Sequence, residues 1–359
     1  MELSPSQTGG SHQPDRSRAA RFSVLAVLAV LMLLGTAAHV RLWKFPTEGQ
    51  DVYYAWVEGG RIVAGENPYA RILSGDMRLN DKYATYFALF YELAAASRWA
   101  GLGDYASWIA FWRVVFLVFT LAIGLLLFSQ AYRRDRILLA VFGLAFWLFN
   151  RWTLHLTQIA HLDVIPIFLV LASLALFDRH RTAALLLFGA SLAIKQIGIF
   201  LAPLYLIWAW RAECAAESAA GRGVDASPGP RTAGERTLIA TLLLIVAIPL
   251  VTSLPFLVWD AEAFSKSILF SATRLPVDHL GVPSFDSLMG WIGLPAKLPM
   301  LALMTLTYWM VWRRHVGRYA ATFLVLATFV DFNSVLFRQY LAWVVALVPL
   351  VALESRDGG

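Results

Sequence analysis

Repeated long apolar stretches constrain this chain more than any other feature of its sequence. The windows 22–40, 109–128, 238–258 and 340–353 contain almost no charged residue. Stretches of this kind suit the hydrocarbon core of a bilayer, which is about 30 Å thick and is crossed by about 20 helical residues. The chain is 58% hydrophobic and only 15% charged, whereas soluble domains carry about 25% charged residues. The sequence therefore predicts an all-α polytopic membrane protein.

The basic character of the chain follows from this class. The net charge is +6 and the sequence pI is about 9.5, but the basic residues form short clusters beside apolar stretches. Positive-inside bias explains such clusters without any affinity for nucleic acid. The single cysteine, Cys214, excludes an intramolecular disulfide.

The basic clusters predict the membrane topology. The arginines before residue 22 and the clusters at 133–136, 178–181, 211–236 and 313–318 are expected on the cytoplasmic side. The expected crossings are 22–42, 107–130, 137–150, 164–177, 182–195, 197–210, 237–258, 296–312, 319–332 and 337–353, which gives about ten transmembrane helices with both termini inside.

One further apolar segment, 83–101, does not fit this parity. We expect it to lie along the outer surface as an interfacial helix. The alternative is that it crosses, which would move 133–136 to the outside.

The same reading divides the chain into regions. Residues 1–21 are expected to form a disordered cytoplasmic tail, 22–40 a retained signal-anchor, and 354–359 a second short tail. Between them, 22–353 is expected to be one transmembrane catalytic domain, with outer loops at 43–106 and 259–295 and an inner linker at 212–236. Several expected spans are short, which predicts helices that end in a water-filled, protein-lined cavity.

Polar residues gather where this topology places the outer ends of spans. Lys195 interrupts an apolar stretch, and an ionisable residue there is costly and therefore a functional candidate. The alternatives are an interfacial lysine that snorkels to water and, for Arg338, an interfacial anchor. His155, His161 and Asp163 lack the i, i+4 spacing of helical zinc sites, so a polar loop is predicted there and no metal site.

Four blocks of the sequence resemble the GT-C superfamily of integral-membrane glycosyltransferases that use polyprenyl-phosphate sugars. The nearest likenesses are the catalytic subunit of the first glycosylphosphatidylinositol mannosyltransferase and bacterial polyprenyl-phosphate-mannose-dependent transferases. The blocks occur in the family's order: Asp51-Val52-Tyr53-Tyr54 to Gly65-Glu66-Asn67-Pro68-Tyr69; Phe146-Trp147-Leu148-Phe149-Asn150 leading to Asp163; Phe188 to Lys195 with Leu201-Ala202-Pro203-Leu204; and Arg338-Gln339-Tyr340-Leu341-Ala342-Trp343 to Pro349.

The resemblance implies a GT-C-like bundle of about ten transmembrane helices with a large first outer loop that contains amphipathic helices. It also implies a polyprenyl-phosphate sugar donor, a glycolipid or glycan acceptor, and an active site on the outer (periplasmic) face of a bacterial inner or plasma membrane. Family members often carry Asp-x-Asp at the start of this loop. Here Asp51 matches the second position, Gly49 occupies the first, and Glu48 is out of register. The comparison therefore favours a single-aspartate mechanism with no metal or other cofactor.

This chemistry assigns roles to particular residues. Asp51 is expected to act as the general base that takes the acceptor's hydroxyl proton; the alternative is that it only caps the helix it begins. The leaving phosphate is already a stable anion, so a cation and hydrogen-bond donors suffice to bind it and an inverting displacement follows. The residues expected to bind the donor phosphate are Arg338, Lys195, Gln339, Tyr340 and Gln158. Those expected to line the substrate site are Glu48, Tyr54, Glu58, Tyr83, His161 and Asp163.

Two other classes of protein stay open at the level of sequence. A transporter or flippase for a lipid-linked or sugar substrate would concentrate polar residues near the bilayer midplane, usually within inverted repeats. Here the polar residues gather at one face and no internal repeat is found. A non-catalytic homologue that serves as a subunit is the other alternative. Mannose is the sugar implied by the resemblance, and arabinose, glucose and galactosamine-type donors remain open.

Overall fold

The protein folds entirely as helices in the part that the structure, a computed structural model, describes: residues 14–75, 83–219, 233–273, 285–291, 293–334 and 336–355. No strand occurs in these ranges. The α-helices are α1 Pro14–Arg41, α2 Asp51–Val63, α3 Leu89–Trp99, α4 Tyr105–Tyr132, α5 Ile137–Phe149, α6 Arg151–Gln158, α7 Val164–Leu176, α8 Arg181–Ile194, α9 Ala202–Ala219, α10 Ala233–Trp259, α11 Ala261–Thr273, α12 Phe285–Met289, α13 Leu294–Trp312, α14 Arg318–Phe332, α15 Leu341–Val345 and α16 Val348–Glu354. Short 3-10 helices are η1 Leu42–Lys44, η2 Ala70–Leu73, η4 Gln196–Leu201 and η5 Arg338–Tyr340.

Every stretch predicted to cross the membrane coincides with one of these helices or with two or three consecutive ones. Four helical segments are long and apolar enough to cross: Phe22–Lys44, Tyr105–Tyr132, Gln196–Ala219 and Gly234–Trp259. A fifth is the pair α5 and α6, which bend by 41° at Asn150. The chain is therefore a helical protein with four to five candidate membrane spans.

The bend between α5 and α6 has a local cause. The side-chain oxygen of Asn150 accepts hydrogen bonds from the backbone N–H groups of Trp152 and Thr153, which caps the start of α6. Its amide group donates back to carbonyl oxygens at the end of α5. One side chain thus satisfies both helix ends at the break.

Helix ends differ from the prediction in two places. α1 begins at Pro14, so residues 14–21 of the tail predicted to be disordered are helical, and 1–13 lie outside the described residues. In the predicted inner linker 212–236, α9 continues to Ala219 and α10 begins at Ala233. Ala-rich sequence has high helix propensity and extends α9 beyond its apolar stretch; 220–232 lie outside the described residues, as do 356–359 of the predicted C-terminal tail.

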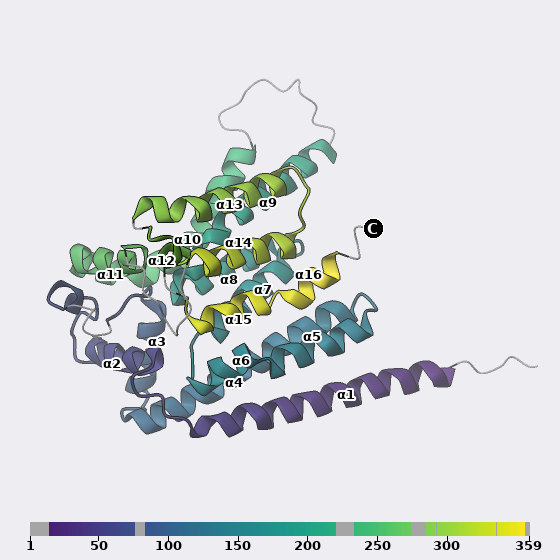
Figure 1. The fold of residues 1–359 in the computed structure, drawn as a ribbon, viewed down its shortest axis with the longest axis horizontal. Coiled ribbons are helices and arrows are strands. Elements are labelled where there is room, and N and C mark those ends of the chain that lie inside the picture. Colours follow the sequence, from purple (N-terminus) through teal and green to yellow (C-terminus); the bar gives the residue numbers. More distant parts are fainter. Residues whose placement is uncertain are drawn as a thin grey trace, which may run out of the picture.

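Most helices lie side by side along the long axis of the molecule, whereas α2, α3 and α11 lie together at one end (Figure 1). The turns that carry the basic clusters at 133–136, 178–181 and 313–318 lie toward the opposite end, where α16 also ends. α3 has 11 residues and is about 16 Å long, which is too short to cross a bilayer. It packs closely against α2, because Gly59 lets the backbone of α2 approach Ala94 and Ala95.

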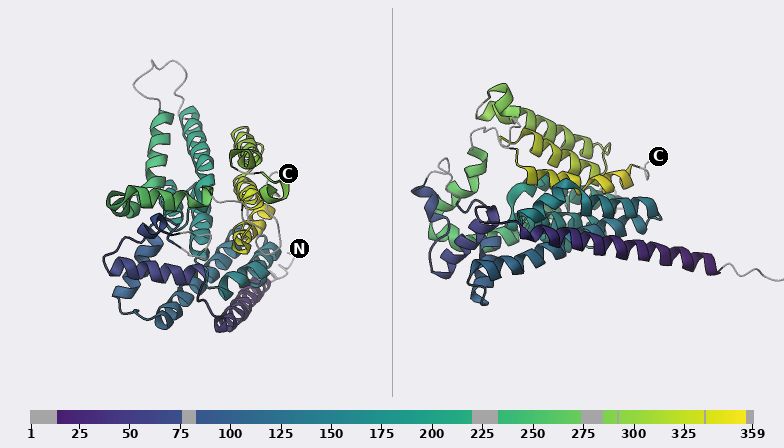
Figure 2. Two further views of the ribbon diagram at one scale, coloured as in Figure 1. Left: turned by 60° about the vertical axis from the view of Figure 1, so that its left-hand side comes forward. Right: turned by 60° about the horizontal axis from the view of Figure 1, so that its bottom comes forward.

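The helices of the bundle share one apolar core. α8 contacts α7 and α10, and Gly189 permits the second contact, since a Cβ there would lie 2.6 Å from the carbonyl oxygen of Ile245. α1 lies at the edge of the bundle, against α4, α5 and α6 (Figure 2).

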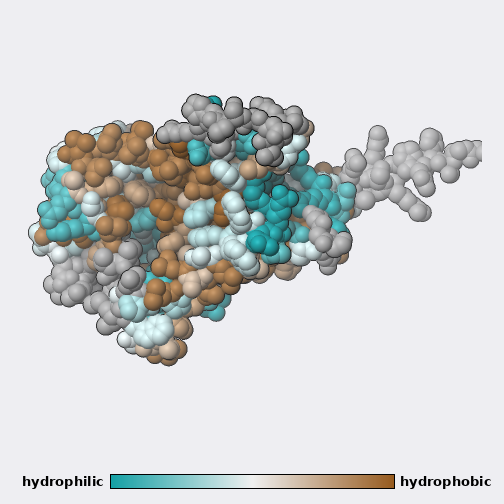
Figure 3. All heavy atoms as spheres, turned by 90° about the horizontal axis from the view of Figure 1, so that it is seen from above, coloured by the Kyte–Doolittle hydropathy of each residue, from teal (hydrophilic) through white to brown (hydrophobic). Residues whose placement is uncertain are grey.

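Many large apolar side chains face outward. They are concentrated on the long helices, with Leu243 and Val251 on α10 60% and 70% exposed. Figure 3 shows broad apolar areas in the middle of one face and hydrophilic side chains toward its ends. A soluble surface rarely carries apolar patches this extensive, and a bilayer accommodates them.

Candidate functional site

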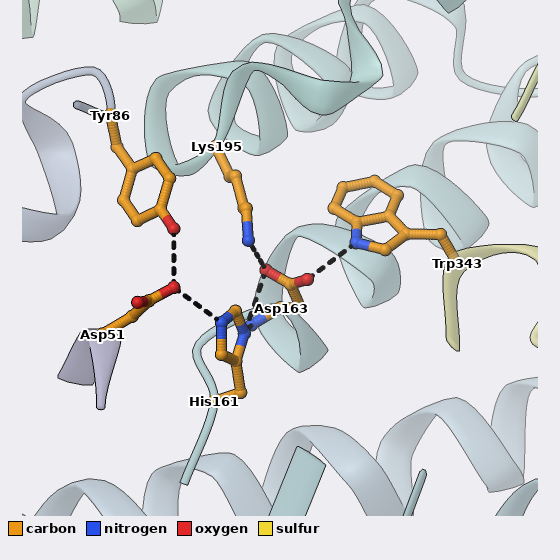
Figure 4. Close-up of polar contacts among 6 residues, drawn as sticks. All are labelled: Asp51, Tyr86, His161, Asp163, Lys195 and Trp343. Carbon is orange, nitrogen blue, oxygen red and sulfur yellow. Dashed lines mark hydrogen bonds and ion pairs between the residues drawn. The ribbon is translucent and has the colours of Figure 1, made fainter. Parts of the chain in front are cut away.

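A network of hydrogen bonds and ion pairs joins five parts of the chain at the end of the bundle that carries α2 (Figure 4). It begins at Asp51, the first residue of α2, directly after a turn in which Gly49 adopts a positive φ of 79°. Gln50 holds the N-cap position of this helix and makes no side-chain cap. The alternative that Asp51 serves as the N-cap is therefore wrong by one residue.

Two donors approach the same carboxylate oxygen of Asp51. The Tyr86 hydroxyl donates to Oδ2 at 2.9 Å, and His161 Nε2 lies 3.1 Å from that oxygen. The Asp51 side chain is 25% exposed, whereas that of His161 is 1% exposed. Asp51 is thus a carboxylate fixed by groups behind it and open on one side.

His161 connects Asp51 to a second, buried carboxylate. Its Nδ1 lies 3.2 Å from Asp163 Oδ1 and accepts from the Asp163 backbone N–H when the ring is neutral. Protonated His161 donates to both carboxylates. The short link between α6 and α7 places the ring between them, with Ala160 in the left-handed region at φ 48°.

Asp163 is fully buried, and each of its carboxylate oxygens accepts a hydrogen bond, one from a charged donor and the other from a neutral one. Lys195 Nζ donates to Oδ1 at 2.6 Å, and Trp343 Nε1 donates to Oδ2 at 3.0 Å. Lys195 itself is 1% exposed, at the break between α8 and η4. A buried carboxylate without such partners would cost several kcal/mol, so this pairing explains how both charges are tolerated inside the bundle.

The protonation states follow from these contacts. Burial opposes ionisation of Asp163, but the nearby charges of His161 and Lys195 and their hydrogen bonds outweigh it and lower its pKa to about 2. Burial by itself would lower the pKa of His161, yet the Asp163 charge and hydrogen bonds to both carboxylates raise it. Burial and the Asp51 charge raise the pKa of Tyr86, so its hydroxyl remains a donor. With His161 protonated and Asp51 ionised, the four charges of Asp51, His161, Asp163 and Lys195 sum to zero.

Aromatic rings surround the buried ammonium group. Lys195 Nζ lies 5.0 Å from the centroid of Tyr86 and 5.4 Å from that of Tyr340, within the range of cation–π attraction. Gln196, the next residue, donates to the carbonyl oxygen of Thr85. These contacts attach the segment before α3 to the start of η4.

The residues predicted to bind phosphate fall into two groups. Tyr340 borders the network through Lys195. Arg338 is exposed on η5, which contacts α6, and its charge acts on His155, to which Gln158 also hydrogen-bonds. Gln339 is partly exposed on the same turn. Lys195 differs from Arg338 and Gln339, because its ammonium group already bonds to Asp163.

The residues predicted to line the substrate site also divide. His161 and Asp163 belong to the network. Glu58 and Tyr83 lie in another cluster: Glu58 Oε1 accepts from Arg71 at 2.8 Å, and the Arg71 guanidinium lies 4.9 Å from the centroid of the Tyr83 ring.

Two further predicted substrate residues contact their neighbours in sequence. The exposed Glu48 accepts from the backbone N–H of Thr47. Tyr54 packs edge-on against Tyr53 at 5.5 Å. Their assignment to the substrate site stays a prediction.

Two members of the network were not assigned a role from the sequence. Trp343 lay within the last block of the family resemblance, and Tyr86 lay among the outer polar residues, but an indole or a phenol near a membrane surface is ordinary. Their partners are 180 and 35 residues away in sequence, so no local pattern marks them.

The described residues contain no group of three or more His, Cys, Asp and Glu side chains arranged to hold a metal ion. In the network, the carboxylates and the imidazole bond to one another and to Lys195. A divalent cation at Asp163 would lie beside this ammonium group.

No profile of a known protein family matches this chain, and no curated protein matches its sequence. The fold and the network therefore carry the functional argument.

Proposed function

We propose that this chain is an integral-membrane glycosyltransferase that moves a sugar from a polyprenyl phosphate to an acceptor hydroxyl, with Asp51 as the general base. The observation that carries the proposal is the position of Asp51. It is the one partly exposed acid of a network whose other acid, Asp163, is fully buried. A catalytic base needs a fixed orientation and one side that is open to the substrate.

The network supports this role through orientation and charge. Tyr86 and His161 both bond to Oδ2 of Asp51. Because Tyr86 and His161 belong to separate segments and both bond to this oxygen, the carboxylate cannot turn freely. A protonated His161 also favours the ionised form of Asp51, which is the form that accepts a proton.

The donor phosphate requires a cation that is accessible to a ligand. Arg338 is exposed on η5, two residues before Tyr340 and just ahead of α15, which carries Trp343, and its planar guanidinium suits two phosphate oxygens. In this scheme Lys195 acts indirectly: it bonds to Asp163, which in turn bonds to His161. Tyr340, Gln339 and Gln158 remain supporting donors.

The proposed reaction is a single displacement. The acceptor hydroxyl gives its proton to Asp51 while its oxygen attacks the anomeric carbon of the sugar. The bond between that carbon and the phosphate oxygen breaks, and its electron pair leaves with the polyprenyl phosphate. The product has the inverted configuration, and the phosphate needs no proton from a general acid.

The proposal includes an orientation in the membrane. The exposed basic turns at 133–136 and 313–318 would lie on the cytoplasmic side, and α2, α3 and the network on the outer side. Together with the short helices α7, α8, α13, α14 and the α15–α16 pair, the four to five candidate spans would make about ten crossings of a bacterial inner membrane. A GT-C-like bundle, whose helices cross the membrane in alternating directions, would fit this arrangement.

The test is transfer by purified protein supplied with a panel of radiolabelled polyprenyl-phosphate sugars and membrane-extract acceptors. We expect one donor to be used and Asp51→Asn to lower turnover by about 10²–10⁴-fold. The matched control is Glu66→Gln, which makes the same chemical change at an exposed acid of the same outer segment and should leave turnover unchanged. Full transfer by Asp51→Asn would overturn the base assignment.

The panel also separates this proposal from the transporter alternative. Wild-type protein that transfers no sugar from any donor, but moves a lipid-linked sugar across vesicles, would exclude the enzyme and establish a flippase.

A further inference from the structure

A groove opens at the other end of the bundle, between the start of α5 and the end of α16. It encloses about 540 Å³ and is lined by Arg136, Ile137, Leu138, Phe142, Ala352 and Leu353, among others. α5 and α16 diverge from a close contact where Gly143, in the middle of α5, meets Pro349, near the start of α16. Figure 1 shows this end of α5 and α16 far from α2, so the groove is separate from the Asp51 network.

The wall of the groove on α5 is apolar and open to the outside. Leu138 is 88% exposed, Phe142 53% and Ile137 44%. These residues begin one of the candidate membrane spans. In a bilayer, this wall therefore faces hydrocarbon, and an acyl chain matches it in polarity and shape.

The rim of the groove is cationic. Arg133, Arg134 and Arg136 are all exposed in the turn from α4 to α5, and Asp135, which also lines the groove, is the one acid between them. The nearest acid on α16, Glu354, is engaged elsewhere: its carboxylate accepts from the backbone N–H groups of Tyr319 and Ala320 at the start of α14. The turn thus keeps a net positive charge beside an apolar wall.

We infer that this groove binds an anionic glycerophospholipid, with the phosphate at Arg136 and Arg133 and one acyl chain along Leu138 and Phe142. Basic pockets between membrane helices on the cytoplasmic side recognise such head groups. A neutral lipid would offer no anion to Arg136 and Arg133, and a free phosphate would leave the apolar wall without a partner. The charge and the apolar wall together select a lipid that carries both features.

The test measures thermal unfolding of the purified full chain in an uncharged detergent, with phosphatidylglycerol, phosphatidylcholine or glycerol 3-phosphate added. Phosphatidylglycerol at 100-fold excess over its dissociation constant should raise Tm by about 5 °C. The other two should have little effect. Equal shifts from phosphatidylglycerol and phosphatidylcholine would overturn the role of charge, and an equal shift from glycerol 3-phosphate would overturn the role of the acyl chain.

Variants locate the site. Arg136→Glu should abolish the shift, whereas Arg313→Glu, which changes an exposed arginine of a different turn, should keep it. Leu138→Trp fills the groove at a side chain that packs against little else, so it should also abolish the shift while leaving Tm without lipid unchanged. If Leu138→Trp and Arg136→Glu both keep the full shift, or if Arg313→Glu loses it equally, the groove is not the binding site. None of these measurements depends on catalysis.

Discussion

Helix α2 carries two acidic side chains, seven residues and therefore about two turns apart on one face, whose surroundings differ sharply. Asp51 is 25% exposed and contacts residues from distant parts of the chain, Tyr86 and His161. Glu58 is 1% exposed and pairs with two nearby arginines, Arg71 at 2.8 Å and Arg61 at 3.5 Å.

The comparison separates Asp51, a carboxylate that a ligand can reach, from Glu58, a carboxylate that is buried and ion-paired. Burial raises the pKa of Glu58 to about 7, against the charges of Arg71 and Arg61, which lower it. This side chain has no free face to offer a substrate. Substitutions of the groups that bond to Asp51 should therefore change activity, and substitution of Glu58 should change stability. Lys195 and Asp163, which are buried behind Asp51, should also affect stability.

Removal of the buried cation should have the largest effect on stability. In Lys195→Met, Asp163 loses its ion pair and becomes a buried charge without a full partner, which costs about 3–5 kcal/mol. Tm in detergent should fall by many degrees. The control is Lys266→Met, whose ammonium group makes an equally short 2.6 Å pair with Glu262 but is 57% exposed; a pair of this kind is worth about 0–1 kcal/mol. Equal Tm changes in the two variants would contradict the assignment.

A double variant distinguishes charge from packing in the same region. Asp163→Asn combined with Lys195→Met removes both charges, so part of the stability lost in Lys195→Met should return. No recovery would mean that the volume of the lysine, and not its charge, supports this part of the bundle.

Glu58→Gln should change how stability depends on pH. The folded-state pKa of about 7 lies above the ordinary 4.5, so between these values the folded state binds more protons than the unfolded state. The free energy of unfolding therefore declines as pH rises through this window, by at most about 3 kcal/mol. The Gln variant should lack this decline in a Tm series from pH 4.5 to 8, whereas Glu66→Gln should keep it. A wild-type profile identical to that of Glu58→Gln would refute the raised pKa.

His161→Gln tests whether the imidazole positions the base. The amide can still donate to Asp51 but cannot carry charge, so we expect turnover to fall by about 10–100-fold, a loss of about 1.4–2.7 kcal/mol. Loss of a neighbouring positive charge raises the pKa of a carboxylate. The acid limb of the pH–rate profile should therefore move to higher pH, a change that a purely structural role would not produce. An unmoved acid limb would show that His161 supports the fold alone.

Tyr86→Phe should have the smallest effect. It deletes one hydrogen bond to Asp51, worth about 1 kcal/mol, so kcat/KM should fall by about 5-fold. Tyr205→Phe is the matched control, since it deletes a buried tyrosine hydroxyl that donates to Ser173 at 2.8 Å within the bundle. Activity that falls equally in both variants would remove the distinction between the Asp51 network and ordinary core bonds.

Local sequence predicted the helices well. Each predicted span falls on one helix or on two or three consecutive helices, because apolar length and charge are properties of neighbouring residues. The ends were less accurate: α1 and the helices around the inner linker extend beyond their apolar windows, since helix propensity continues where hydropathy stops. The candidate site was predicted in part, with Asp51, His161, Asp163, Lys195 and Tyr340 gathered in one region.

The sequence by itself determined that this chain is helical, suited to a membrane, and equipped with ionisable residues in places where a bilayer makes them costly. Only the tertiary structure decided their partners. It paired Lys195 with Asp163, added Tyr86 and Trp343, and separated Glu58 from Asp51 although both lie on one helix. The physical reason is that a buried charge is stabilised by whatever group packing brings within about 3 Å, and that group comes from helices 32 to 180 residues away.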